Sequence, residues 1–161
     1  MDISESAKNY IEKMFAGAAV PPLAETDPEF AALFANFAFD EVVKQDDLDD
    51  KTRFIAILAA LVGCQGVDAF KGMLHAALNF GVTAEEAREI VYQAVAYLGI
   101  GRVLPFFAAA NEVFAASGIS LPLDGCAAVT AENRLERGEQ TQVDIFGEGM
   151  RGFSKSGPQE S

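Results

Sequence analysis

Apolar side chains recur every three or four residues through most of this chain, and this spacing restricts it to a helical fold. In the first such segment Ala7, Ile11 and Phe15 follow one another at intervals of four, which places them on one face of an α-helix. The same periodicity predicts further helices over residues 28–38, 54–62, 68–80, 84–98 and 103–114, and a polar tail helix over residues 130–147. No segment has the alternating pattern of a half-buried strand. We therefore expect an all-α protein, a bundle of about six helices followed by a tail helix.

Several helix boundaries carry end signals. Thr83 and Glu86 have the spacing of a capping box, in which each side chain satisfies a free backbone N–H at a helix start. Gly81, just before them, suits a left-handed C-terminal cap of the preceding helix. Asp27 followed by Pro28 predicts another helix start. The segment 54–62 is apolar all round, so we expect its helix to be the central and most buried one.

Charge and composition narrow the classes of partner. Twenty-four acidic and twelve basic residues give a net charge of −12, which argues against a nucleic-acid partner and an anionic membrane surface. The longest apolar run, from Phe54 to Cys64, is too short to cross a bilayer. The first residues do not resemble a secretory signal. We therefore expect a cytoplasmic protein with no membrane partner.

The apolar content also predicts self-association. Half of the residues are hydrophobic and thirteen are Phe, which is more apolar material than a compact monomer usually hides. We expect one helical domain over residues 1–118, with its core at residues 30–118. Residues 119–151 form a C-terminal extension whose helix needs other surfaces to pack on, either its own domain or a neighbouring subunit. The last segment, residues 152–161, is expected to be disordered.

The segment 68–80 carries the strongest candidate for a functional site. Its polar residues Asp68, Lys71, His75 and Asn79 fall within one narrow strip of a helix that is otherwise apolar or Gly. His75 is the single histidine, so it is the candidate for proton transfer near neutral pH. The structural alternative is that this strip is simply where the helix meets water. One histidine and two distant cysteines give no metal site of recognised spacing, so no metal is expected.

Four short motifs follow one another along the chain. They are LDDKTR at residues 48–53, HAAL at 75–78, GVTAEE at 81–86 and YLG at 97–99. In this order they resemble the carboxymuconolactone decarboxylase family, whose superfamily includes alkylhydroperoxidase-type proteins. The resemblance covers about residues 30–118 and implies an alkylhydroperoxidase-like helical fold that assembles as a trimer or hexamer. A tail segment, from Arg134 to Gly147, also resembles a stretch that precedes the core helices in relatives.

The peroxidase branch of this superfamily implies a dithiol catalyst with a C-x-x-C pair four residues before a histidine. Counted back from His75, the two cysteine positions hold Asp68 and Lys71. The dithiol nucleophile is therefore missing. Cys64 would lie further back along the same strip if the helix extended that far, which leaves a single-cysteine antioxidant protein as a remote alternative.

The decarboxylase branch implies a cofactor-free lyase that acts on a small anionic lactone or keto acid, with His75 in proton transfer. Lys71 could hold a carboxylate or an enolate, and Asp68 could orient it. Arg53 and Arg102 are candidates to complete the pocket with Cys64. Their structural alternatives are a bond from Arg53 to the acidic loop at 46–50 and a helix-end role for Arg102. A catalytically silent, oligomeric binding or scaffold protein is the alternative to the enzyme.

Overall fold

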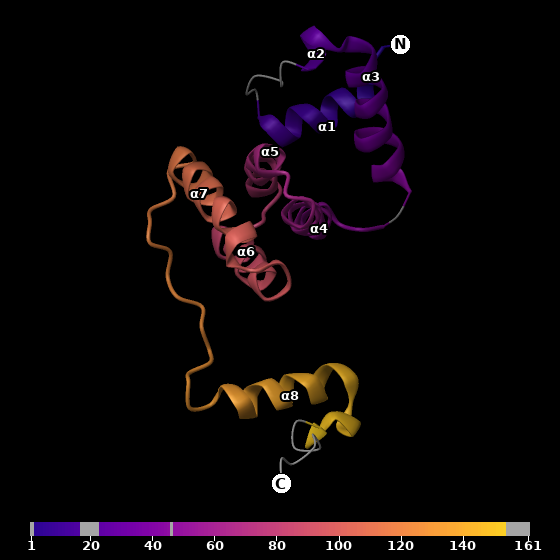
Figure 1. Cartoon of the computed structure of the whole chain (residues 1–161). Helices are drawn as coiled ribbons and strands as arrows, with labels where there is room; N and C mark the ends of the chain where they lie inside the picture. Colours follow the sequence, from indigo (N-terminus) through magenta and orange to yellow (C-terminus); the bar gives the residue numbers. More distant parts are fainter. Residues whose placement is uncertain (1, 17–22, 46, 154–161) are drawn as a thin grey trace. The chain divides into compact units, whose positions relative to one another are not determined.

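The computed structural model describes residues 2–16, 23–45 and 47–153, and Figure 1 shows its helices in chain order. They are α1 (Glu5–Phe15), α2 (Leu23–Thr26), α3 (Pro28–Asn36), α4 (Asp50–Gly63), α5 (Val67–Asn79), α6 (Ala84–Leu98), α7 (Ile100–Ala116) and α8 (Arg134–Phe146). A π-helical turn, Phe37–Glu41, and a 3-10 turn, Val42–Lys44, continue α3, and a second 3-10 turn, Glu148–Met150, follows α8. No strand occurs in these ranges, so the all-α prediction is confirmed.

The chain forms two compact units, the first ending at Leu123 and the second beginning at Asp124. The sequence placed the end of the helical domain at Gly118, five residues earlier. Ile119 and Leu123 pack against the core of the first unit. Nη1 of Arg88 also donates a hydrogen bond to the Leu123 carbonyl at 3.2 Å. The segment between α7 and α8, residues 117–133, is called the connector below. These contacts are why its residues 119–123 belong with the helices before it.

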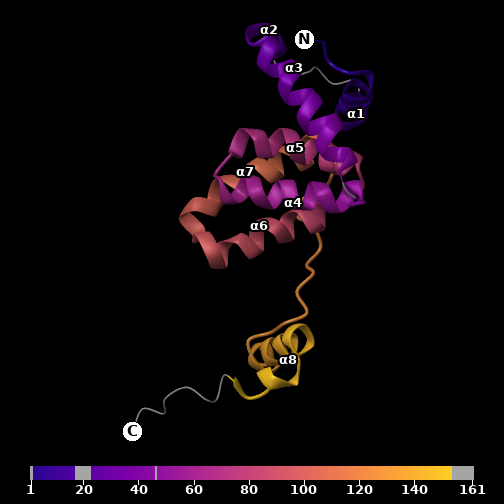
Figure 2. The same ribbon diagram turned by 90° about the vertical axis from the view of Figure 1, so that its right-hand side faces the viewer.

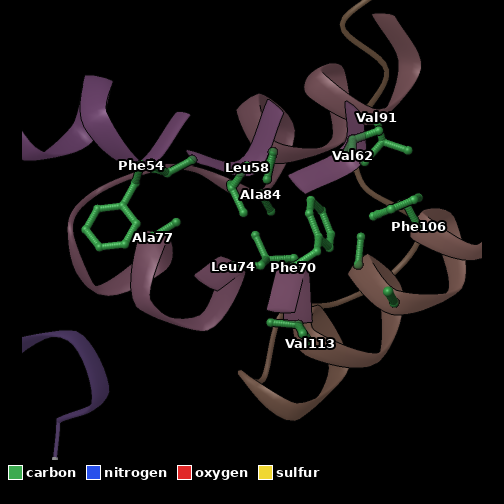
Figure 3. Packing of buried hydrophobic residues seen from close by; sticks show 14 of the residues in the cluster. Phe54, Leu58, Val62, Phe70, Leu74, Ala77, Ala84, Val91, Phe106 and Val113 are labelled. Carbon is green, nitrogen blue, oxygen red and sulfur yellow. The ribbon is translucent and has the colours of Figure 1, made fainter. Parts of the chain in front are cut away.

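Four helices enclose the core of the first unit. Helices α4 and α7 each contact both α5 and α6, and Figure 2 shows the four lying side by side. Phe70 and Phe106 are fully buried at its centre, with ring centroids 5.2 Å apart and planes at 90°, the edge-to-face geometry that aromatic pairs favour. Leu58 and Leu74 are likewise fully buried, and they lie close to Phe70 in Figure 3.

The predicted helix starts are largely confirmed. The Thr83 hydroxyl accepts a hydrogen bond from the Glu86 N–H at 3.2 Å, and the Glu86 carboxylate accepts one from the Thr83 N–H at 2.8 Å. Gly81 has a φ of +85°, in the left-handed region that favours glycine. Helix α3 begins at Pro28 as predicted, but the Asp27 side chain makes no capping hydrogen bond.

The expectation that the helix over 54–62 is the most buried one is wrong. Helix α4 buries one face, made by Arg53, Phe54, Leu58 and Val62, and it exposes Ala56, Ala59 and Ala60. More residues are buried in α7, namely Val103, Phe106, Ala109, Ala110, Val113 and Phe114. Segment 54–62 is apolar all round because its second face consists largely of small alanines. The first unit leaves these alanines exposed.

The second unit contains α8, close to the predicted tail helix. Asn133, rather than Thr130, precedes its first turn, because the Thr130 N–H donates to the Asn133 side chain at 2.7 Å in a turn before the helix. Ile145 and Phe146 are 66% and 71% exposed. Residues 154–161, most of the segment expected to be disordered, lie outside the described residues. Across the described chain, none of the helices combines the length and the apolar character needed to cross a membrane.

Candidate functional site

Helix α5 carries the candidate polar strip and is held by α1, α4 and α7. Its core face is fully buried at Phe70, Leu74, Ala76 and Ala77. This burial fixes the rotation of the helix and therefore the direction of the opposite face. On that face Asp68 and Asn79 are exposed, whereas Lys71 and His75 are partly buried.

Lys71 forms an ion pair with Glu112 of α7. Its Nζ atom lies 2.5 Å from Oε2 of Glu112, and the two side chains are 38% and 63% exposed. The hydrogen bond to Glu112 raises the pKa of Lys71, and the charges of Glu112 and Asp68 act in the same direction. Lys71 is therefore an ammonium group at neutral pH, suited to holding an anion and unsuited to acting as a base.

His75 lies one helical turn after Lys71 and is partly buried. Within the described part of the chain its imidazole makes no hydrogen bond and no ion pair. Its nitrogens therefore lack a described protein partner, unlike the ends of most buried polar side chains. At the end of the strip Asn79 instead donates to the Met14 carbonyl of α1 at 2.8 Å, which makes Asn79 a structural contact between helices.

Asp68 belongs to the strip of Lys71 and His75, but Cys64 does not. Asp68 is exposed in the first turn of α5, near enough for its charge to act on Lys71. Cys64 lies outside α5, because α4 ends at Gly63 and Gln65 takes a positive φ of 63° before α5 begins at Val67. The Cys64 thiol is exposed and contacts the Leu61 carbonyl at 3.5 Å. The condition for Cys64 to join the strip, a helix that extends back to residue 64, is therefore not met.

Arg53 has a structural environment in the first unit. It is only 9% exposed, and Nη2 donates to the Leu48 carbonyl at 2.9 Å, in the loop before α4. Tyr10 donates to the Asp50 carboxylate at 2.7 Å beside it. Burial raises the pKa of Tyr10, the Asp50 carboxylate raises it further, and Arg53 opposes the shift. The bond to Leu48 is the contact with the loop at 46–50 that the structural alternative for Arg53 expects, although its acceptor is a backbone carbonyl.

Arg102 is exposed in the first turn of α7. Glu112, which pairs with Lys71, lies ten residues later on the same helix, or about 15 Å at 1.5 Å per residue. The structure therefore brings together Asp68, Lys71 and His75 but does not add Arg102 to them. It adds Glu112, which the sequence analysis missed because the pair joins residues 41 apart.

The described part of the chain contains a cavity of about 390 Å³ between α6, α7 and the connector. Its lining includes Arg88 and Tyr92 of α6 and Asn111 of α7, but neither Lys71 nor His75. The strip on α5 and this cavity are therefore separate places on the first unit. They share α7 as a neighbour, because Glu112 faces the strip and Asn111 faces the cavity.

A comparison with a characterised protein supports a distant relationship. The chain is 29% identical over 98 residues to the 4-carboxymuconolactone decarboxylase of Acinetobacter baylyi. The aligned region covers 61% of this chain and 73% of that enzyme.

A comparison with protein families gives a more extensive match. The sequence model of the carboxymuconolactone decarboxylase family matches residues 28–112, more than half of the 161 residues. This range includes α3 to α6 and most of α7, and it contains the capping box, the polar strip of α5 and the Lys71–Glu112 pair. The chain is a member of the carboxymuconolactone decarboxylase family.

Proposed function

We propose that this protein is a cofactor-free lyase that decarboxylates a small anionic lactone or keto acid, with His75 as the proton-transfer group. The observation that carries the proposal is the position of His75, partly buried and without a described protein partner, one turn from the ammonium group of Lys71. The named activity of the Acinetobacter relative supports the reaction class.

The chemistry of such a reaction needs two groups from the protein. The bond between the carboxylate and its neighbouring carbon breaks, carbon dioxide leaves, and the electron pair moves into the conjugated carbonyl as an enolate. The imidazolium of His75 then gives a proton to the enolate carbon next to the carbonyl. A positioned acid contributes roughly 10²–10⁴-fold in rate, and a cation beside the enolate oxygen lowers the barrier further.

Lys71 is the cation in this proposal, and Glu112 keeps it charged. A substrate anion has to replace or share the Glu112 carboxylate. Because both partners are more than a third exposed, the pair is of the kind that contributes little to stability and exchanges readily. The charge of Asp68 raises the pKa of Lys71 in the same direction as Glu112 does.

The strip on α5 also needs a cover that keeps water out. We propose that a second copy of the chain supplies it within a homo-oligomer, a trimer or a hexamer. Helix α3 and the turn after it expose large apolar side chains that such a contact would bury. Phe30, Leu33, Phe34 and Phe37 are 46% to 56% exposed.

The test is release of carbon dioxide from 4-carboxymuconolactone, a lactone, and from β-keto acids. We expect turnover by the wild-type protein, a fall of about 100-fold or more in His75→Asn, and a raised KM in Lys71→Gln. Lys8→Gln, an exposed lysine of α1, is the charge-matched control. Turnover that His75→Asn leaves unchanged would refute the role of His75.

A catalytically silent binding or scaffold protein is the second candidate. The engagement of Lys71 by Glu112 and of Arg53 by the Leu48 carbonyl favours it, because both cations then have structural partners. An oligomer that binds small anions without any turnover would support this candidate. An alkylhydroperoxidase-type antioxidant function is disfavoured because Asp68 and Lys71 stand at the positions of the thiol pair.

A further inference from the structure

The cavity between α6, α7 and the connector has the size of a ligand site. Its volume of about 390 Å³ is near the lower end of the roughly 300–1,000 Å³ found for small-molecule pockets. Residues Leu121 to Leu123 of the connector form one wall, and the two helices form the others. The bond from Arg88 to the Leu123 carbonyl holds this wall against α6.

The charge of the lining selects for an anion. Ten residues line the cavity, and Arg88 is the one charged residue among them. In a chain with a net charge of −12, a lining with a guanidinium and no carboxylate is a local exception. Arginine also suits a carboxylate, because its planar donors match the two carboxylate oxygens.

The other walls select for an apolar, flat body. Tyr92 and Phe107 face each other across α6 and α7, with ring centroids 5.5 Å apart and planes inclined by 33°. The guanidinium carbon of Arg88 lies 5.5 Å from the Tyr92 ring centroid, so the charged and aromatic parts of the site are adjacent. Asn111 adds a side-chain amide, and Phe114 adds a buried apolar surface.

We propose that this cavity binds a small organic monocarboxylate with an apolar or aromatic body, its carboxylate at Arg88 and its body against Tyr92, Phe107 and Phe114. The site is separate from the strip on α5 and does not depend on the lyase proposal.

Benzoate is the probe, and benzyl alcohol is its uncharged counterpart of similar shape. Titration of the ¹⁵N-labelled full chain with benzoate is expected to shift the amide signals of residues 88–92 and 107–114. Benzyl alcohol is expected to bind about tenfold or more weakly, because a hydrogen bond to a charged group is worth roughly 1.5–3 kcal/mol. Inorganic phosphate, which has the charge without the apolar body, is expected to bind more weakly than benzoate.

Arg88→Gln is expected to weaken benzoate binding by a similar factor of about ten or more. Arg137→Gln, an exposed arginine of α8, makes the same change in net charge and is expected to leave binding unchanged. Because Arg88 also holds the connector, a second variant keeps Arg88 and fills the cavity instead. Asn111→Phe replaces an exposed lining residue and is expected to abolish the shifts.

Four results would overturn the proposal, and the first three concern the cavity itself. These are no shifts in α6 and α7 at millimolar benzoate, equal affinity for benzyl alcohol, or benzoate binding that survives both Arg88→Gln and Asn111→Phe. The NMR signals of the single imidazole, that of His75, distinguish benzoate binding in the cavity from benzoate binding at the proposed lyase site. Benzoate shifts that centre on His75 and Lys71, and spare residues 88–92, would place the anion on α5 and refute a site at Arg88.

Discussion

The ammonium group of Lys71 on α5 lies 2.5 Å from a carboxylate oxygen of Glu112 on α7. This ion pair lies one helical turn before the single histidine, and it joins two of the four helices that enclose the core. Any anion that binds beside His75 through Lys71 therefore competes with Glu112. The acid limits the affinity of the strip for anions while it keeps the lysine charged.

Replacing Glu112 by Gln is expected to strengthen anion binding at the strip, because the competing carboxylate is removed. If the strip is the lyase site, KM for an anionic substrate should fall severalfold without a matching rise in kcat. Steady-state kinetics on Glu112→Gln and on the exposed control Glu136→Gln of α8 measures this. An unchanged KM would show that substrate does not meet Lys71.

The loss of stability caused by Glu112→Gln should depend on pH in a defined direction. The pKa of Lys71 is raised in the folded protein above its ordinary value of 10.5. The pair therefore stabilises the fold below that value, and its contribution is lost as pH rises through the folded pKa. Glu112→Gln should be slightly less stable than wild type in urea at pH 7, and the difference should disappear at strongly alkaline pH. A stability difference between Glu112→Gln and wild type that increases with pH would contradict the prediction.

Removal of the Glu86 side chain should destabilise the first unit at neutral pH. The hydrogen bond from Lys51 is the main cause that lowers the pKa of Glu86, and the N–H of Thr83 adds to it. The contribution is present above the ordinary value of 4.5 and is lost as pH falls through the lower, folded pKa. The measurement is urea unfolding of Glu86→Ala and Glu85→Ala from pH 7 to pH 3. Both residues lie in the first turn of α6, but only Glu86 forms the capping box, so the difference between the variants reports the cap rather than the helix dipole. Equal losses at all pH values would argue against an ionised cap.

Phe70→Ala should be among the most destabilising single substitutions. The side chain is fully buried and packs edge-on against Phe106, and such a truncation costs about 3–5 kcal/mol. Tyr97→Ala, at an aromatic residue that is 87% exposed, should stay within about 0.5 kcal/mol of wild type. If Phe70→Ala does not fold, Phe70→Leu should still show a measurable loss in urea unfolding.

Truncation after Leu123 should leave the first unit folded and reduce the size of the assembly. The second unit begins at Asp124, and Ile145 and Phe146 of α8 give it an exposed apolar surface, which the proposed oligomer would cover. Light scattering reports the mass, and circular dichroism reports whether the helices persist. A monomeric full-length chain would remove the oligomer proposal, and an unchanged mass after truncation would show that the tail does not cross between subunits.

The protein should have no dithiol peroxidase activity. Neither Asp68 nor Lys71 can form the attacking thiolate. Hydroperoxide turnover measured on wild type, Cys64→Ser and Cys126→Ser tests this. Turnover lost with Cys64→Ser but kept in Cys126→Ser would show that the exposed thiol of the α4–α5 turn is reactive.

The sequence was sufficient for features that depend on near neighbours. The capping box at Thr83, the left-handed Gly81 and the helical periods involve residues within one or two turns, where spacing dictates geometry. Burial was less predictable, because the exposure of Ala59 and Ala60 depends on which helices cover α4. The Lys71–Glu112 pair depends on how α5 crosses α7, which no local pattern encodes.

Asn111 and Glu112 are consecutive residues of α7, and successive residues of an α-helix point about 100° apart. One of them lines the cavity at Arg88, and the other holds Lys71. Helix α7 is therefore a shared wall, and any rotation about its axis would move both side chains together.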